Sequence, residues 1–149
     1  MRAVIQRVGR CTVTVDGRMV GAISSGLLVY LGVGKDDTEA DASYLAEKTL
    51  NLRIFQDSEG KMNLSVLETH EEILVVSQFT LYADARRGRR PSYSDSAPPE
   101  LGRALYDEYL RRLAASGVAA QTGSFGASME VAYTNLGPVT ILLDSQKLF

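Results

Sequence analysis

The sequence is poor in the residues that form disulfides or bind transition metals. Its 149 residues include one cysteine, Cys11, one histidine, His70, and no tryptophan. A single cysteine excludes an internal disulfide and a cysteine-based zinc cluster, and a single histidine excludes sites built from several histidines. His70 stands in the polar segment 68–72, which is typical of a solvated loop. If the protein is an enzyme, we therefore expect it to work without imidazole.

Long apolar runs are also missing. Residues 27–31 and 141–143 are among the longest, and neither approaches the roughly 20 residues of a membrane-spanning helix. Polar residues interrupt the first seven positions, so these do not form a signal-like segment. The length fits one domain, and a hydrophobic share of 45% is ordinary for a globular protein. We therefore predict a single domain over residues 1–149, soluble, cytoplasmic and not bound to a membrane.

The formal net charge of −2 hides an uneven distribution of charge. Four positive charges lie within five residues, at Arg86, Arg87, Arg89 and Arg90, and without them the chain would carry −6. A basic spot on an acidic body can bind phosphate locally and repel polyanions elsewhere. Charge alone favours the plainer interpretation, a solvated loop. The balance argues against indiscriminate binding of nucleic acid.

Strand patterns dominate the first third of the chain. Alternating or continuous apolar segments predict strands at residues 3–8, 11–15, 19–23 and 27–33. The last of these is apolar throughout, which suits a strand covered on both faces. Asp16-Gly17 predicts a type I′ hairpin, because both central positions of that turn need a positive φ.

Two segments have helical periodicity. The first helix opens at residues 38–41, where Thr38 can cap it and acidic residues suit the positive end of the helix dipole. The second is predicted for residues 99–116, from Pro99 to just before Gly117. Their inner faces are predicted to consist of Leu45, Thr49 and Leu52 in the first helix, and Leu101, Leu105, Tyr109 and Leu113 in the second.

The remaining segments are predicted as strands and turns. Strands are expected at residues 51–55, 61–66, 73–82, 118–122, 129–134 and 139–143, with a turn at 57–60 and a long polar loop at 83–99. Many strands and two helices indicate a mixed α/β domain. We predict a largely antiparallel sheet or barrel-like β core with two main helices packed outside.

Ser77-Gln78-Phe79-Thr80 places three hydrogen-bonding side chains in an otherwise apolar strand. Burying such groups without partners costs roughly 2–7 kcal/mol. Either the strand crosses here from the core to an edge, or the residues belong to a site. The sequence leaves both interpretations open.

Two further segments are punctuated by glycine. Residues 135–140 contain Gly137-Pro138, which fits a plain turn or a cis bond, and glycine permits close approach by another molecule. Residues 123–127 show no phosphate-binding pattern, but they are able to present Phe125 beside a flat ring. Each signal is weak alone.

In their order and spacing, these segments resemble the D-aminoacyl-tRNA deacylase family, and the resemblance runs the length of the chain. Its two signature motifs correspond to residues 77–81 and 135–140. Residues 1–8, 26–29, 52–55, 60–63 and 88–91 are also similar to the family. One departure is Leu136, where bacterial members often carry Asp. It lies outside the Gly-Pro pair and affects at most the polarity of the loop.

The resemblance implies a homodimer with two sites at its interface. Gly137-Pro138 of one subunit, in cis, would reach into the other subunit's pocket beside Ser77, Gln78, Phe79 and Thr80. Arg7 would help to hold this loop. Phe125 and Met129 match positions that line the pocket for the terminal adenosine. No metal and no organic cofactor is implied.

The activity implied is hydrolysis of the ester bond in D-aminoacyl-tRNA. Backbone N–H groups around Phe79 and Thr80 can form an oxyanion hole, and the ribose 2′-hydroxyl of the tRNA can assist. Thr80 as a nucleophile is the competing mechanism, although the sequence shows no base to activate it. An L side chain would meet the Gly-Pro wall and be excluded. Glycine has no side chain for this wall to exclude, so glycyl-tRNA-Ala, which is tRNA-Ala mischarged with glycine, is an expected substrate.

Two other functions compete with this hypothesis. The first is a related deacylase that clears an L-amino acid from mismatched tRNA. Deacylases of that kind differ at the first motif, so residues 77–80 argue against this function. A non-catalytic nucleic-acid-binding module would use Arg86, Arg87, Arg89 and Arg90 and would bind D- and L-aminoacyl-tRNA equally. We expect the partner to be the aminoacylated 3′ end of tRNA, contacted through these arginines, and not DNA.

Overall fold

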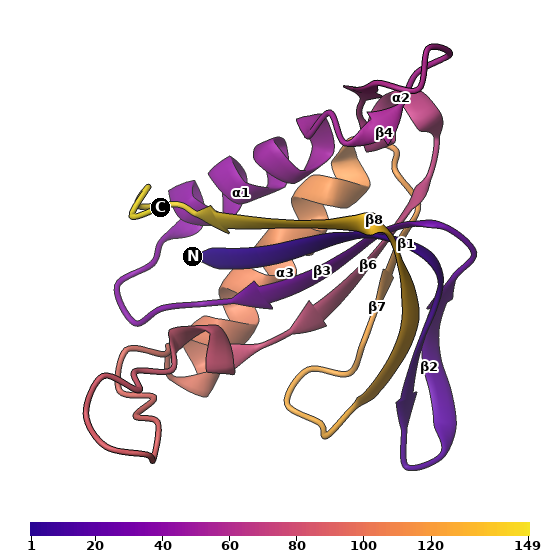
Figure 1. Ribbon diagram of the computed structural model, residues 1–149. Coiled ribbons are helices and arrows are strands. Elements are labelled where there is room, and N and C mark those ends of the chain that lie inside the picture. Colours follow the sequence, from indigo (N-terminus) through magenta and orange to yellow (C-terminus); the bar gives the residue numbers. More distant parts are fainter.

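A six-stranded mixed sheet is the framework of the computed structural model, which describes residues 1–149 (Figure 1). The strand order is β2-β1-β3-β6-β7, and β8 pairs with the other edge of β1. The strands are β1 (Arg2–Val15), β2 (Arg18–Ile23), β3 (Gly26–Gly32), β6 (Glu72–Ser77), β7 (Ala120–Thr122) and β8 (Glu130–Asp144). The three pairings of β1 are antiparallel, whereas β3-β6 and β6-β7 are parallel.

The sheet curves until it is nearly a closed barrel. The long strands β1 and β8 bend together, and β2 returns to contact β6 and β7 (Figure 1). Gly21 marks the closest approach, because a Cβ atom there would lie 2.4 Å from the carbonyl oxygen of Thr122. Only a residue without a side chain permits β2 to lie so close to β7.

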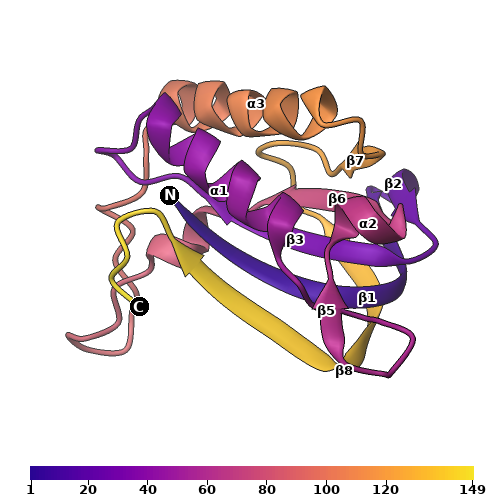
Figure 2. The same cartoon turned by 90° about the horizontal axis from the view of Figure 1, so that it is seen from above.

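Two long helices cover one face of this sheet, as Figure 2 shows: α1 (Glu39–Asn51) and α3 (Pro99–Ala115). A carboxylate oxygen of Asp41 accepts a hydrogen bond from the N–H of Thr38 at 2.8 Å and closes the start of α1. The smaller elements are β4 (Phe55–Gln56) and β5 (Met62–Leu64), which form a separate hairpin, the one-turn helix α2 (Val66–Thr69), and the 3₁₀ turn η1 (Phe79–Tyr82).

The main core lies between the helices and the sheet and contains 20 buried hydrophobic residues. A second cluster of seven fills the curved end of the sheet: Val8, Cys11, Val13, Ile23, Leu28, Leu74 and Val76. Burial raises the pKa of the Cys11 thiol to about 11, so this cysteine is a packing residue at neutral pH. No helix is long and apolar enough to cross a membrane.

The predicted fold class and both main helices are confirmed. Asp16 and Gly17 have φ values of 49° and 74° and join two paired strands, as the hairpin signal requires. The strand predicted from residue 27 is buried on both faces, and Gly117 follows the end of α3 with a φ of 82°. His70 is exposed, as expected for a surface residue.

Several predicted strand boundaries are wrong. Residues 3–8 and 11–15 form the single strand β1, and 129–134 and 139–143 form the single strand β8, because paired backbone continues through their polar interruptions. Asn51 belongs to α1, and only Phe55 of the strand predicted for residues 51–55 lies in a strand, β4. The return strand shortens to Met62–Leu64, because Ser65 is the N-cap of α2.

The most informative correction concerns the strand predicted for residues 73–82. Strand β6 ends at Ser77, and Phe79–Tyr82 forms the 3₁₀ turn instead. The apolar character of Leu81 and Tyr82 continues the sequence pattern, but these residues pack beside the end of β3, not in the sheet.

Candidate active site

The polar motif after β6 forms a tight turn with exposed backbone donors. The N–H of Gln78 donates to the carbonyl of Leu31 at 2.8 Å and completes the pairing with β3. Phe79 and Thr80 then open η1, so their N–H groups have no acceptor within that turn. The Gln78 side-chain amide donates to the Thr80 hydroxyl. The turn therefore offers two adjacent N–H groups at the end of a buried strand.

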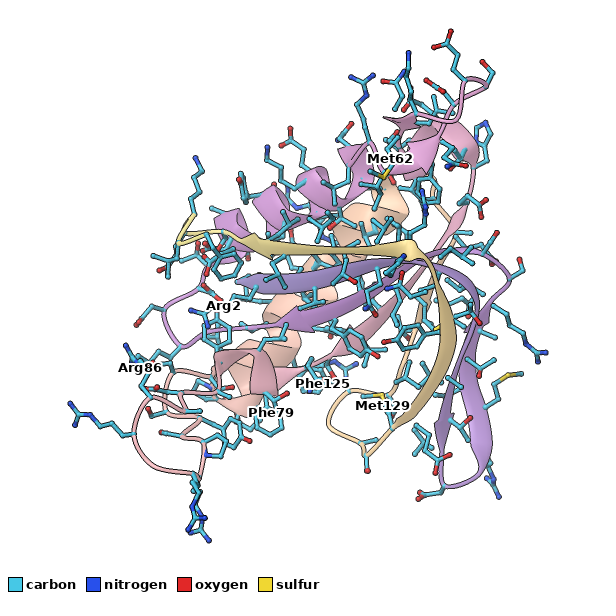
Figure 3. All side chains as sticks on the ribbon, viewed as in Figure 1. Arg2, Met62, Phe79, Arg86, Phe125 and Met129 are labelled. Carbon is cyan, nitrogen blue, oxygen red and sulfur yellow. The ribbon has the colours of Figure 1, made fainter.

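A cavity of about 680 Å³ lies against this turn. Ser77, Gln78 and Phe79 line one side of it, and Phe125 and Met129 line the other. Figure 3 shows the labelled side chains of Phe79, Phe125 and Met129 gathered around the same space. Eleven of the 19 lining residues are hydrophobic, and the volume falls within the range of small-molecule sites. Thr80 stands just outside the lining.

The Phe125 wall is braced by helix α3. The rings of Tyr106 and Phe125 have centroids 5.5 Å apart, and the Arg103 guanidinium lies 5.6 Å from the centroid of Phe125. The Tyr106 hydroxyl donates to the carbonyl of Val75 at 3.0 Å. Burial raises the pKa of Tyr106 above its ordinary value, so this donor keeps its proton at neutral pH. These contacts hold the Phe125 ring in the cavity wall, and an aromatic ring in such a wall suits stacking on a flat ligand.

The loop before α3 closes another side of the cavity. Tyr93 contacts Phe79 edge to face, with ring centroids 5.1 Å apart. The loop is tied to the sheet because the N–H of Ala97 donates to the carbonyl of Val33 at 2.9 Å. Tyr93 and Tyr106 also line the cavity, although neither was predicted from the sequence. An aromatic residue in a serine- and proline-rich loop was the available signal for Tyr93, whereas Tyr106 is indistinguishable from a core position of α3.

The Gly137-Pro138 pair lies away from this cavity within the chain. The bond is cis, as the resemblance implies, and both residues are exposed in the middle of β8. The Arg7 side chain donates to the carbonyl of Leu136 at 3.2 Å and to that of Ile54 at 2.6 Å, which ties the pair to neighbouring loops. None of residues 135–140 lines the cavity. One chain therefore does not bring its own Gly-Pro pair to its own residues 77–80.

The four clustered arginines are exposed at the tip of the loop between η1 and α3. Arg86 forms an ion pair with Asp84 at 2.8 Å, which holds the pKa of that carboxyl well below its usual range. Arg87, Arg89 and Arg90 form no ion pair in the chain. Figure 3 shows Arg86 pointing away from Phe79, and none of the four arginines lines the cavity.

Residues 4–144 match the family model described as D-Tyr-tRNA(Tyr) deacylase. The chain belongs to this family. It is 58% identical over 149 residues to a D-aminoacyl-tRNA deacylase of Thermosipho africanus, and the match covers 100% of both chains. It is 62% identical over 145 residues to a D-aminoacyl-tRNA deacylase of Roseiflexus castenholzii, and this match covers 97% of this chain and 92% of the relative.

Two solved structures are similar to this chain in their fold. The c-Myc DNA unwinding element binding protein superposes with a TM-score of 0.90 at 40% identity, covering 97% of this chain and 98% of the other. A probable eukaryotic D-amino acid tRNA deacylase superposes with a TM-score of 0.81 at 20% identity, covering 95% and 97%. This second likeness shows that the two chains share a fold. No group of three or more His, Cys, Asp or Glu residues is arranged to hold a metal ion.

Proposed function

We propose that the protein hydrolyses the ester bond of D-aminoacyl-tRNA in the cavity at the end of β6, releasing free tRNA and the D-amino acid. One observation carries this proposal: a single apolar cavity is lined both by Phe79, which opens the 3₁₀ turn, and by the aromatic ring of Phe125. The wall suits a terminal adenine ring, and the turn suits the reacting carbonyl. Family membership supplies the reaction class, a hydrolase that acts on aminoacyl-tRNA.

The proposed chemistry uses backbone donors. Water adds to the ester carbonyl carbon, the N–H groups of Phe79 and Thr80 stabilise the developing oxyanion, and the bond to the ribose oxygen breaks as that oxygen takes up a proton. Each such donor contributes roughly 2.7–4 kcal/mol in other enzymes. The neighbouring ribose 2′-hydroxyl assists the proton transfer. Thr80 is a poorer candidate for the nucleophile, because its hydroxyl contacts the Gln78 amide, which is not a base.

We further propose that two chains form a homodimer in which each Gly137-Pro138 pair faces the other subunit's cavity. The free edge of β8 supports this, because this 15-residue strand pairs with no strand other than β1. A long unpaired edge is usually covered in a native protein. Tyr133, Leu136 and Leu142 expose 38%, 44% and 56% of their surface along it. Arg7 would then steady the loop that crosses the interface.

The same arrangement is the proposed basis of chiral proofreading. With the ammonium group and the carbonyl of the substrate held in place, an L side chain would point into the Gly137-Pro138 backbone of the partner subunit. A D side chain would point toward solvent, so many D-amino acids would be accepted. Glycine has no side chain to exclude. We therefore propose glycyl-tRNA mischarged on tRNA-Ala as a second substrate.

The tRNA is proposed to contact Arg86, Arg87, Arg89 and Arg90, with the protein acting in the cytoplasm. The loop that carries these exposed arginines also contributes Tyr93, Ser94 and Ser96 to the cavity lining, which supports this assignment. We do not propose DNA as a partner, because only this loop concentrates positive charge on an otherwise acidic chain. Duplex DNA belongs among the competitors in the assay, since one similar solved structure is named for binding a DNA unwinding element.

The decisive experiment is a hydrolysis assay with D-tyrosyl-tRNA, L-tyrosyl-tRNA and glycyl-tRNA-Ala at equal concentrations. We expect rapid release of D-tyrosine and glycine, and L-tyrosyl-tRNA left intact. Excess duplex DNA should leave the rates unchanged. A protein that binds both tyrosyl-tRNAs equally and hydrolyses neither would be a binding module, and our proposal would be wrong. Hydrolysis of both enantiomers would instead remove only the proofreading claim.

A further inference from the structure

A buried carboxylate lies directly behind the 3₁₀ turn. The Asp37 side chain is 1% exposed and accepts hydrogen bonds from three groups. One oxygen accepts from the Met1 α-ammonium at 2.6 Å, and the other accepts from the Tyr82 hydroxyl at 3.0 Å and the Gly34 N–H at 2.5 Å. A buried charge persists only when it is paired and hydrogen-bonded. Asp37 therefore joins the start of β1 to Tyr82, the last residue of η1.

Arg2, the first residue of β1, contacts the same 3₁₀ turn. Its guanidinium donates to the carbonyl of Leu81 at 3.0 Å and lies 4.5 Å from the centroid of the Tyr82 ring. It also donates to Asp144 of β8 at 3.0 Å, which fixes the direction of the side chain. Figure 3 shows the labelled Arg2 on the side of the turn away from Phe125. One arginine thus holds both the backbone and the terminal ring of the turn.

Gly32, the last residue of β3, and Gly34 also pack against the 3₁₀ turn. A Cβ atom at Gly34 would lie 2.7 Å from the Tyr82 ring, and one at Gly32 would lie 3.0 Å from the carbonyl oxygen of Gln78 and from the Leu81 Cβ. Asp37 and Arg2 fix the Tyr82 ring, so it cannot swing away as a flexible side chain would. The turn therefore packs directly against the backbone of Gly32 and Gly34, with no room for a side chain between them.

We propose that Arg2, Asp37 and Tyr82 are positioning residues that aim the N–H groups of Phe79 and Thr80 into the cavity, an inference that rests on the proposed function. We name these three residues the turn clamp. None of them lines the cavity or reaches the substrate. The turn clamp contacts the last two residues of the four-residue turn η1. A rotation of the backbone at Tyr82 therefore redirects the N–H groups of Phe79 and Thr80 at the start of the turn. Oxyanion donors act only when they lie roughly 2.7–3.1 Å from the developing charge.

Tyr82→Phe tests the clamp with little risk to folding, because it removes one hydroxyl and leaves the Asp37–Met1 pair and the Arg2 stacking in place. The matched control is Tyr109→Phe. Tyr109 is fully buried, and its hydroxyl donates to Thr49 at 2.8 Å between α3 and α1, away from the cavity. Gly34→Ala is a second variant that pushes the Tyr82 ring from the opposite side. All three are compared with the wild type by steady-state hydrolysis of D-tyrosyl-tRNA over a range of substrate concentrations and by thermal unfolding.

We expect Tyr82→Phe and Gly34→Ala to lower kcat by roughly tenfold or more, as small misplacements of catalytic groups do. KM should not change, because the cavity lining is intact. Tyr109→Phe should lower the melting temperature yet keep the kcat of the wild type. A wild-type kcat in Tyr82→Phe, or equal losses of kcat in both tyrosine variants, would overturn the clamp. Thr80→Pro separates the two hypotheses: if it is fully active, the proposed site itself is wrong, whatever Tyr82 does.

Discussion

At the scale of single residues, Thr80 separates a backbone mechanism from a side-chain mechanism. We expect Thr80→Ala to keep substantial D-specific hydrolysis, because it retains the N–H that stabilises the oxyanion. Thr80→Pro removes that N–H and should lose activity by roughly a hundredfold or more. Proline is tolerated in the first turn of a helix, so this variant should fold. Rates for both variants on D-tyrosyl-tRNA provide the measurement, and a covalent aminoacyl adduct trapped on Thr80 would refute the backbone mechanism.

Other single residues show how context decides a role. Gln78 and Thr80 hydrogen-bond to each other, so two of the polar groups that are unexpected in an apolar strand satisfy one another. Cys11 is buried among aliphatic residues, and its raised pKa leaves it a neutral thiol at physiological pH. The identity of each residue was visible in the sequence. Its partner was not, because the partner's position depends on where the backbone turns.

At the scale of elements, the arginine-bearing loop is expected to set tRNA affinity and not the chemistry. Arg89 and Arg90 form no ion pair in the chain, so they are free to contact phosphates. Each neutralised phosphate contributes roughly −0.7 to −0.9 to the slope of log affinity against log salt. Replacing both residues with alanine should flatten that slope by about one to two units. KM should rise while the preference for D over L is unchanged.

A charge-matched double variant, Arg10→Ala with Arg18→Ala, serves as the control. It removes two exposed positive charges from the region of the β1–β2 hairpin, far from the loop in Figure 1. Its salt slope should equal that of the wild type. If Arg89→Ala with Arg90→Ala leaves the slope unchanged but dissociates the dimer, the loop braces the subunits and the tRNA assignment is wrong.

At the scale of the whole molecule, the proposed dimer predicts that two inactive chains can restore activity together. Thr80→Pro disables a chain's own cavity. Gly137→Val disables the loop offered to the partner, because a Cβ at Gly137 would lie 2.7 Å from the Val139 side chain and the residue has a φ of 133°. In a mixed dimer, one site carries both defects and the other carries neither. Random mixing should therefore leave about a quarter of all sites intact.

Refolding the two variants separately and together, followed by D-tyrosyl-tRNA hydrolysis and sedimentation, provides the measurement. Each variant alone should be nearly inactive and dimeric. A mixture that stays inactive would mean that the Gly-Pro pair does not serve the partner's cavity. A fully active monomer of the wild-type chain would refute the dimer itself.

The sequence by itself determined the fold class, the two long helices, the Asp16-Gly17 hairpin and the family, because these depend on local periodicity, turn chemistry and motifs that stay contiguous along the chain. Tertiary structure decided where β6 ends, since hydropathy is the same for Leu81 whether it continues a strand or packs beside β3. It also decided that Tyr93, Tyr106, Phe125 and Met129 share one cavity, and that Arg2 and Asp37 lie behind the turn. These contacts join residues dozens of positions apart. Their distances are set by how the curved sheet packs against α3, and no local pattern encodes that geometry.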